Sequence, residues 1–274
     1  MRNLTFIVLA ATALCALLSS PPAAAQFSAA ITPPRFELEL EPGKTLRNVL
    51  EITHGGVQPG VYRVYTADWD MAADGSIRFD SNAPLAQSCR PWVALERREV
   101  RIAPSAKMRF RFEVAAPADT PAQECRFALM IESAEQTIGT GAVQIPMSGR
   151  IGVIVYARMG GVKAELRVVE VKSVSSEGQL VPALAVRNVG TATGRFTGFA
   201  SATLPDGSVV DLAPNSIPIL PGMERTVELL PLPPADRPNQ PAATLKWPLR
   251  VKGKLDSGQR DTPQIVIDSL LQKP

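Results

Sequence analysis

The sequence predicts an all-β protein with two β-sandwich domains in series. Its 274 residues include 25 prolines and 19 glycines, which lie between short apolar runs, as in β-structure with many turns. Apolar and polar residues alternate along many segments, and long helical periodicity is absent. A length of ~150 residues per domain gives about two domains. With 45% hydrophobic and 20% charged residues, the composition excludes a disordered or collagen-like chain.

Residues 1–25 have the layout of a secretory signal peptide. Arg2 is followed by the apolar stretch Leu4–Leu18, and Ala23–Ala25 matches an Ala-x-Ala cleavage site. The stretch is short for a membrane span. We expect a cleaved signal, a mature chain that begins at Gln26, and no stable membrane insertion after cleavage. The compartment is then the periplasm if the organism is a Gram-negative bacterium; an uncleaved anchor or a lipoprotein is the alternative.

The next part of the chain follows the period of β-strands. Phe110 and Phe112, for example, alternate with Arg109 and Arg111, so that one face is apolar and the other charged. A longer strand, 142–156, becomes apolar on both faces at its end, which suits a strand that passes from a sheet edge toward another domain. The expected strands before it are 36–41, 46–53, 61–69, 92–95, 100–102, 108–114 and 126–132.

The second half repeats this pattern after a glycine pair at 160–161. The expected strands are 164–174, 180–188, 196–204, 209–212, 223–230, 244–254 and 264–270. About seven short strands in ~110 residues is the count of an immunoglobulin-like sandwich. The predicted organisation is a signal peptide at 1–25, one immunoglobulin-like domain at 26–160 and a second at 161–274.

Two cysteines, Cys89 and Cys125, remain after signal removal. A pair of cysteines in an exported chain is typical of a disulfide; two buried free thiols are the alternative. The chain has no Cys-x-x-Cys spacing, so a redox or zinc site is poorly supported.

Several function classes are disfavoured by the composition. His54 is the single histidine, which argues against histidine-based catalytic triads and multi-histidine metal sites. A formal net charge of +3 is too small to indicate a nucleic-acid partner. No catalytic constellation is apparent. We therefore expect a protein that is not an enzyme and that needs neither a cofactor nor a metal.

A series of short segments follows one another along the first half of the chain. They are Pro34-Arg35-Phe36 before a Pro-Gly turn, Pro91-Trp92-Val93, Val100-Arg101-Ile102-Ala103-Pro104, the strand from Met108 to Val114, Arg126 to Glu132, and Val155-Tyr156-Ala157-Arg158. As an ordered set, these segments resemble the PapD-like periplasmic chaperones that assemble pili with an outer-membrane usher, and the resemblance covers residues 30–160. The second half resembles the family only in being an expected sandwich.

The resemblance implies that the protein binds exported pilus subunits and lends them its seventh, edge strand. Val143, Ile145 and Met147 have the alternation that such a donor strand requires; alternatively, they face the core of their own domain. Pro146 lies between them and removes one N–H from the strand.

The resemblance also implies that two basic residues in the cleft between the domains bind the C-terminal carboxylate of the subunit. By position these are Arg35 and Arg150, and a carboxylate between two arginines gains charge-assisted hydrogen bonds. Alternatively, Arg35 pairs with Glu37 or Glu39 on a solvated face, and Arg150 is likewise surrounded by water. A different function also stays open, that of a structural or adhesive exported protein that is itself part of a surface assembly.

Overall fold

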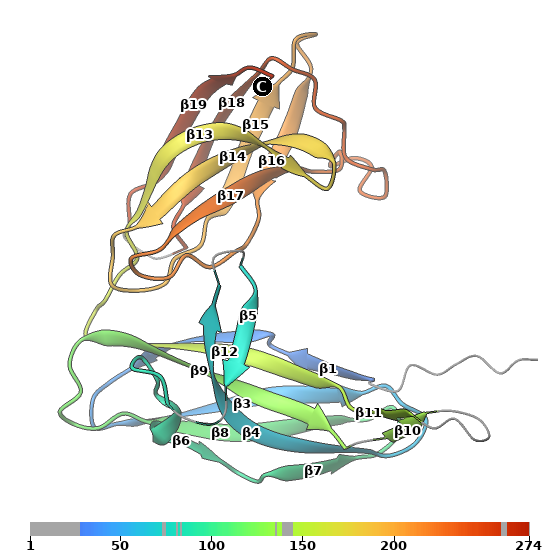
Figure 1. Ribbon diagram of the computed structural model, residues 1–274, viewed down its shortest axis with the longest axis vertical. Coiled ribbons are helices and arrows are strands. Elements are labelled where there is room, and N and C mark those ends of the chain that lie inside the picture. The colour runs from blue at the N-terminus through green and yellow to red at the C-terminus, as the bar shows by residue number, and fades with distance from the viewer. Residues whose placement is uncertain are drawn as a thin grey trace, which may run out of the picture.

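The protein is built of two β-sandwich domains, as predicted (Figure 1). The computed structural model describes residues 28–72, 75–80, 82, 84–134, 136–138, 145–258 and 262–273, without the side chains of 136–138 and 145–147. The expected signal peptide, 1–25, lies outside these residues. Within the described part of the chain, the one helical element is the 3-10 helix η1 (Arg90–Trp92).

The first domain packs two sheets face to face. One sheet has the order β1 (Ala29–Thr32), β3 (Thr45–His54), β8 (Lys107–Ala115) and β6 (Val93–Leu95). The other has the order β2 (Arg35–Leu40), β12 (Arg150–Met159), β9 (Gln123–Ser133), β4 (Gly60–Met71) and β5 (Ile77–Asp80), with β7 (Glu99–Ile102) also paired to β4.

The alternation seen in the sequence places the core of this domain. Phe110 and Phe112 of β8 are buried between the sheets, whereas Arg109 and Arg111 are exposed. The chain enters through β1 in one sheet and continues as β2 in the other. Pro33 and Pro34, which cannot donate to a ladder, separate these two strands. This switch places β2 parallel to β12.

The long strand expected at 142–156 is instead two strands. β11 (Ile145–Met147) pairs with β10 (Gln136–Ile138), and β12 begins at Arg150. Between them the Gly149 N–H donates to the hydroxyl of Ser133 at 3.0 Å, and the Ser133 N–H donates to the carbonyl of Gly149 at 2.9 Å. The side-chain hydrogen bond takes the place of a regular ladder contact, which separates the two strands.

In the described part of the second domain, seven strands form one continuous path, which folds over a shared core of residues such as Leu184, Leu212 and Val251. One expected strand, 244–254, begins only at Leu249, directly after Pro248. The order is β13 (Leu166–Ser176), β14 (Gln179–Asn188), β17 (Glu224–Pro231), β16 (Val209–Pro214), β15 (Thr197–Thr203), β18 (Leu249–Asp256) and β19 (Ile265–Leu271).

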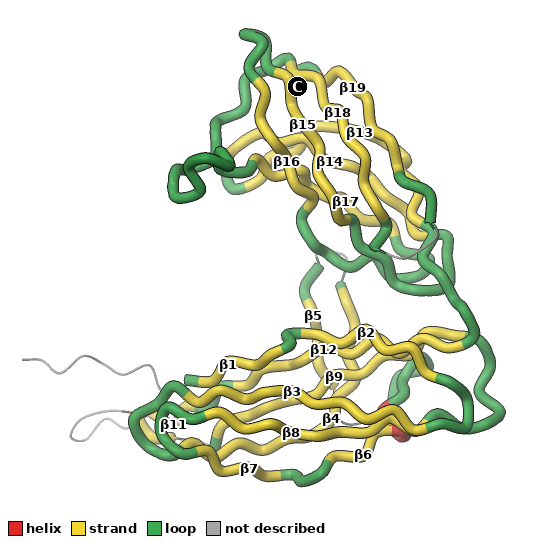
Figure 2. The backbone as a smooth tube through the Cα atoms, turned by 180° about the vertical axis from the view of Figure 1, so that it is seen from behind, coloured by secondary structure: helices red, strands yellow, loops and turns green. Residues whose placement is uncertain are grey.

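A hairpin arm of the first domain reaches the second domain (Figures 1 and 2). The arm consists of the end of β4, from Asp68, together with β5. Trp69 of the arm belongs to a buried cluster that also contains Leu220 of the second domain. The Arg225 guanidinium of the second domain donates to the carbonyl oxygen of Ala72 at 2.7 Å. Apolar packing and a charge-assisted bond therefore join the domains here.

Cys89 and Cys125 are joined by a disulfide, with their Cα atoms 5.5 Å apart. Both residues are buried in the first domain. The bridge ties the segment before η1 to β9, the strand that lies between β12 and β4 in its sheet.

Candidate functional site

A pocket of about 480 Å³ lies between the two domains. The first domain contributes the start of β2 and the end of β12, and the second domain contributes loops around residues 193–197, 216 and 257. The lining residues are Pro33, Pro34, Arg35, Glu37, Arg158, Thr193, Arg195, Thr197, Ser216, Ser257 and Gly258.

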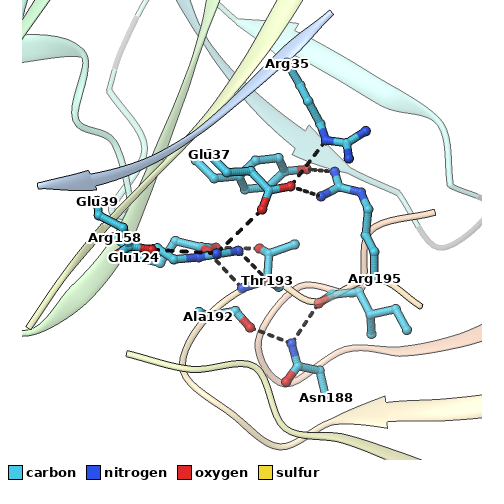
Figure 3. Close-up of polar contacts among 11 residues, drawn as sticks. Arg35, Glu37, Glu39, Glu124, Arg158, Asn188, Ala192, Thr193 and Arg195 are labelled. Carbon is cyan, nitrogen blue, oxygen red and sulfur yellow. Dashed lines mark hydrogen bonds and ion pairs between the residues drawn. The ribbon is translucent and has the colours of Figure 1, made fainter. Parts of the chain in front are cut away.

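The carboxylate of Glu37 lies at the centre of the charged groups of this pocket (Figure 3). Its Oε1 accepts from Arg35 Nε at 3.3 Å and from a terminal nitrogen of Arg195 at 3.1 Å. Its Oε2 lies 3.6 Å from Arg158. One carboxylate of β2 thus contacts three guanidinium groups, one of them from the second domain.

Arg195 is held in place by Tyr156 of β12. Its second terminal nitrogen donates to the Tyr156 hydroxyl at 2.8 Å, and its guanidinium carbon lies 4.9 Å from the centre of the Tyr156 ring. Burial raises the pKa of the Tyr156 hydroxyl, and the nearby Arg195 charge opposes that shift. The Arg195 side chain is only 10% exposed, so its position is set by the packing of both domains.

Below the pocket, a buried carboxylate connects the domains. Glu124 of β9 accepts from Arg158 Nε at 3.1 Å and from the Thr193 N–H at 2.9 Å, and it also accepts from the Thr193 hydroxyl. Arg158 in turn donates to the Thr193 carbonyl at 2.8 Å. Glu124 and Arg158 belong to the first domain and Thr193 to the second, and both first-domain residues bind Thr193. This network therefore fixes the loop at 193 on the first domain.

The charges of the site balance. Arg35, Arg158 and Arg195 are opposed by Glu37, Glu124 and the exposed Glu39, which lies 3.9 Å from Arg158. An anion that enters the pocket therefore meets guanidinium groups that already have carboxylate partners.

The two arginines of the predicted carboxylate site lie in different surroundings. Arg35 lines the pocket and pairs in register with Ile154 of β12. Arg150 lies four residues earlier on β12, at ~13 Å along the strand, and pairs with Glu132. A common carboxylate for Arg35 and Arg150 stays a prediction, because the structure does not place the two side by side.

Arg150 belongs to a second polar group on the same sheet. There Glu132 accepts from the Tyr65 hydroxyl at 2.8 Å and from Arg63 at 3.1 Å. The hydrogen bond from Tyr65, together with that from Arg63, holds the pKa of Glu132 below its ordinary value, although partial burial opposes the shift; Arg150 adds a smaller lowering through its charge.

Part of the predicted donor segment lies on a strand that has a partner on one side only among the described residues. Ile145 and Met147 lie in β11, which pairs with β10 on one side only, and Val143 lies outside the described residues. On β12, pairing with β2 begins at Ile154. From 145 to 153, therefore, the edge opposite β10 and β9 has no strand partner within the part of the chain that the structure describes.

Pro146 modifies this edge without closing it. It lies opposite Thr137 in the ladder with β10. Because proline has no N–H, Pro146 removes one backbone donor from β11 and keeps its carbonyl acceptor.

Sequence reasoning missed Glu124, Arg158, Thr193 and Arg195. One signal was present for Arg158, because a charged residue at the end of a strand that is apolar on both faces needs a buried partner. That partner and the two residues of the second domain are far away in sequence. Within the described residues, no group of three or more His, Cys, Asp or Glu side chains converges as a metal site requires.

Comparisons with known proteins were made by sequence and by structure. No family model and no curated protein matches the sequence. Solved structures do match. The chain is similar in structure to fimbrial chaperones.

Three of these structures illustrate the similarity. YadV chaperone has 12% identity and a TM-score of 0.44, and the match covers 89% of this chain and 100% of that one. The class 5 fimbriae chaperone CfaA has 11% identity and a TM-score of 0.45, with 90% and 99% covered. The SafB chaperone of Salmonella enterica, solved with SafA pilin, has 16% identity and a TM-score of 0.43, with 89% and 99% covered.

Among the described residues, no helix is both long and apolar enough to span a membrane.

Proposed function

We propose that this protein is a periplasmic chaperone that binds exported subunits of a pilus or a related surface structure. It caps a subunit by adding an edge strand to it and hands it to an outer-membrane usher. Such capping needs backbone hydrogen bonds and apolar side chains, and it needs neither a nucleotide nor a catalytic group.

The observation that carries the proposal is the free edge from 145 to 153. An unpaired strand edge is a template for another strand, and proteins usually cover or block it. Here β2 covers β12 only from Ile154 onward. The edge is continuous with a strand that is anchored in the sheet by β9, so that an added strand would be held rigidly.

The pocket beside Arg35 supports the same proposal. A subunit strand that pairs with this edge and runs toward the cleft ends near Arg35, which is 47% exposed along its side chain. An arginine there would bind the terminal carboxylate and thereby fix the register of the added strand. Arg150 lies along the same edge, at the end of the strand away from the cleft.

A periplasmic pull-down with identification of the captured protein by mass spectrometry tests the proposal. Ser148 lies between β11 and β12, so Ser148→Pro removes a backbone donor from this segment, whereas Ser148→Ala keeps it. We expect the wild type and Ser148→Ala to capture a small secreted subunit, and Ser148→Pro to lose it.

Separate Arg35→Ala and Arg150→Ala variants tell the two arginines apart. Loss with Arg35→Ala supports carboxylate anchoring in the cleft, and loss with Arg150→Ala as well supports a role for both. If no variant affects capture, strand addition and anchoring are both wrong. If the wild type captures no subunit and is found in surface polymers, the protein is a structural component instead.

A further inference from the structure

The pocket between the domains already holds a carboxylate, that of Glu37. Both Arg35 and Arg195 donate to its Oε1, at 3.3 and 3.1 Å. This is the arrangement that two arginines adopt around a bound carboxylate. The Glu37 carboxylate is held on the side of the pocket that faces solvent, with 34% of its side chain exposed.

Arg195 has no other acidic partner among the contacts of the described residues. Its remaining terminal nitrogen donates to the neutral hydroxyl of Tyr156, and its side chain is 10% exposed. A buried guanidinium that loses its carboxylate is strongly disfavoured unless another anion replaces it. Removal of Glu37 would therefore leave the Arg195 guanidinium without its carboxylate partner, and the site would bind another carboxylate in its place.

Arg158 does not share this property. It is bound to Glu124 at 3.1 Å and to the carbonyl of Thr193 at 2.8 Å, and it lies farther from Glu37, at 3.6 Å. Its partners persist whether or not Glu37 is present. The ligand-binding pair of the pocket is thus Arg35, from the first domain, and Arg195, from the second.

We propose that Arg35 and Arg195 form a carboxylate-binding site spanning both domains, and that Glu37 occupies it until the terminal carboxylate of a bound chain displaces it. Glu37 is an internal competitor that weakens binding of short or incorrectly placed chains. A ligand anchored along the neighbouring free edge presents its carboxylate at high effective concentration and displaces Glu37.

This inference rests on the proposed function for the identity of the natural ligand, but its test does not. The probe is a synthetic peptide, acetyl-Val-Thr-Val-Thr-Val, with either a free C-terminal carboxylate or a C-terminal amide. Binding to the full mature chain is measured by isothermal titration calorimetry for the wild type and for Glu37→Gln.

While Glu37 competes for the site, the apparent affinity for the peptide carboxylate equals the intrinsic affinity multiplied by the fraction of time in which the site is free. If Glu37 fills the site at least ~90% of the time, its removal tightens binding of the acid peptide about tenfold or more. The amide peptide should show no such gain. Adding Arg195→Gln to Glu37→Gln should abolish it.

Glu39→Gln is the matched control. Glu39 lies two residues farther along β2, on the same face, and its side chain is 73% exposed. Its removal changes the net charge by the same amount and leaves the Arg35–Arg195 site filled. We expect less than a twofold effect on the acid peptide, because an exposed charge is screened by solvent and salt.

The proposal is overturned if Glu37→Gln and Glu39→Gln tighten binding equally, or if the amide gains as much as the acid. It is also overturned if Arg195→Gln leaves the gain intact. If Glu37→Gln does not unfold cooperatively, Glu37→Thr, with a residue favoured in strands, takes its place. If Glu37→Gln tightens binding of the acid peptide but the wild type captures no subunit, the carboxylate site stands and the proposed function is wrong. If the wild type captures a subunit but Glu37→Gln does not tighten peptide binding, only the present inference is wrong.

Discussion

Glu124 provides the sharpest test of how the two domains are held together. Its side chain is 2% exposed, and it accepts from Arg158 on its own domain and from the N–H and hydroxyl of Thr193 on the other. In Glu124→Ala these donors lose their acceptor. Breaking a buried ion pair by removal of one partner costs about 3–5 kcal/mol, and we expect a loss of this size in the free energy of unfolding.

Glu124→Gln separates charge from shape. The amide oxygen can take the place of Oε2, which accepts from Arg158 Nε and from the Thr193 N–H, and the NH₂ group then faces the Thr193 hydroxyl, which can accept from it. The negative charge opposite Arg158 is lost. We expect a smaller loss, about 1–3 kcal/mol. Urea unfolding followed by intrinsic fluorescence gives both values. For Glu124→Ala, calorimetry should in addition show that the transitions of the two domains move apart, because the hydrogen bonds from Thr193 to Glu124 are gone.

Glu41→Gln is the control, since Glu41 pairs with Lys44 at the surface and is 70% exposed. Surface pairs of this kind contribute about 0–1 kcal/mol. If Glu124→Ala costs no more than Glu41→Gln, the buried network does not hold the domains together. A double-mutant cycle with Thr193→Val should give a coupling of about 1 kcal/mol or more; additive effects would contradict the direct contact.

Three further changes have expected outcomes. The hydrogen bond from the Tyr65 hydroxyl is the main cause that lowers the pKa of Glu132 from 4.5. The ionised Glu132 therefore contributes stability above pH 4.5, and this contribution is lost as the pH falls through the lower pKa of the folded state. Glu132→Gln should flatten the pH dependence of the unfolding midpoint below about pH 4.5. In Gly152→Ala, the new Cβ would overlap the Phe79 ring, so we expect a cost of about 1–3 kcal/mol in urea unfolding, largely relieved by Phe79→Ala. Pro146→Thr restores an N–H at the free edge and should increase self-association in sedimentation velocity.

These three expectations have their own controls. Glu165→Gln, at an exposed pair with Arg167, should leave the acid limb of the stability curve unchanged. An equal cost of Gly152→Ala with and without Phe79 would mean that the ring does not cover the glycine. Pro205→Thr, in a turn, should not change self-association; if Pro146→Thr behaves like it, the edge at β11 is not limited by its missing donor.

Local pattern determined much of the fold in advance. The alternation around Phe110 and Phe112 predicts β8 and its buried face, and it does so because each residue's direction in a strand follows from a period of two. The short strands β1, β5 and β10 were not predicted, whereas the equally short β6 and β7 were. The expected strand at 142–156 was wrong in its continuity, because the break depends on a hydrogen bond to Ser133, a residue from a different strand.

The candidate site shows the same division. Arg35 was identified from the segment around it. Residues two apart lie on the same face of a strand, so a pair of Arg35 with Glu37 was one of the alternatives, and the structure contains that pair. Arg195, by contrast, is 158 residues from Glu37 in sequence. No local pattern relates them, since their meeting depends on how the second domain packs against the arm and on the buried bond of Glu124 to Thr193.

The sequence alone therefore determined the strand class, the two-sandwich organisation and the buried faces, because hydrophobic alternation is a property of neighbouring residues. Only the tertiary structure decided which strand edge stays free, which charges meet in the cleft, and that Glu37 fills the space between Arg35 and Arg195. These features depend on contacts between distant segments, whose energies are set by burial and geometry that appear only when the domains are assembled.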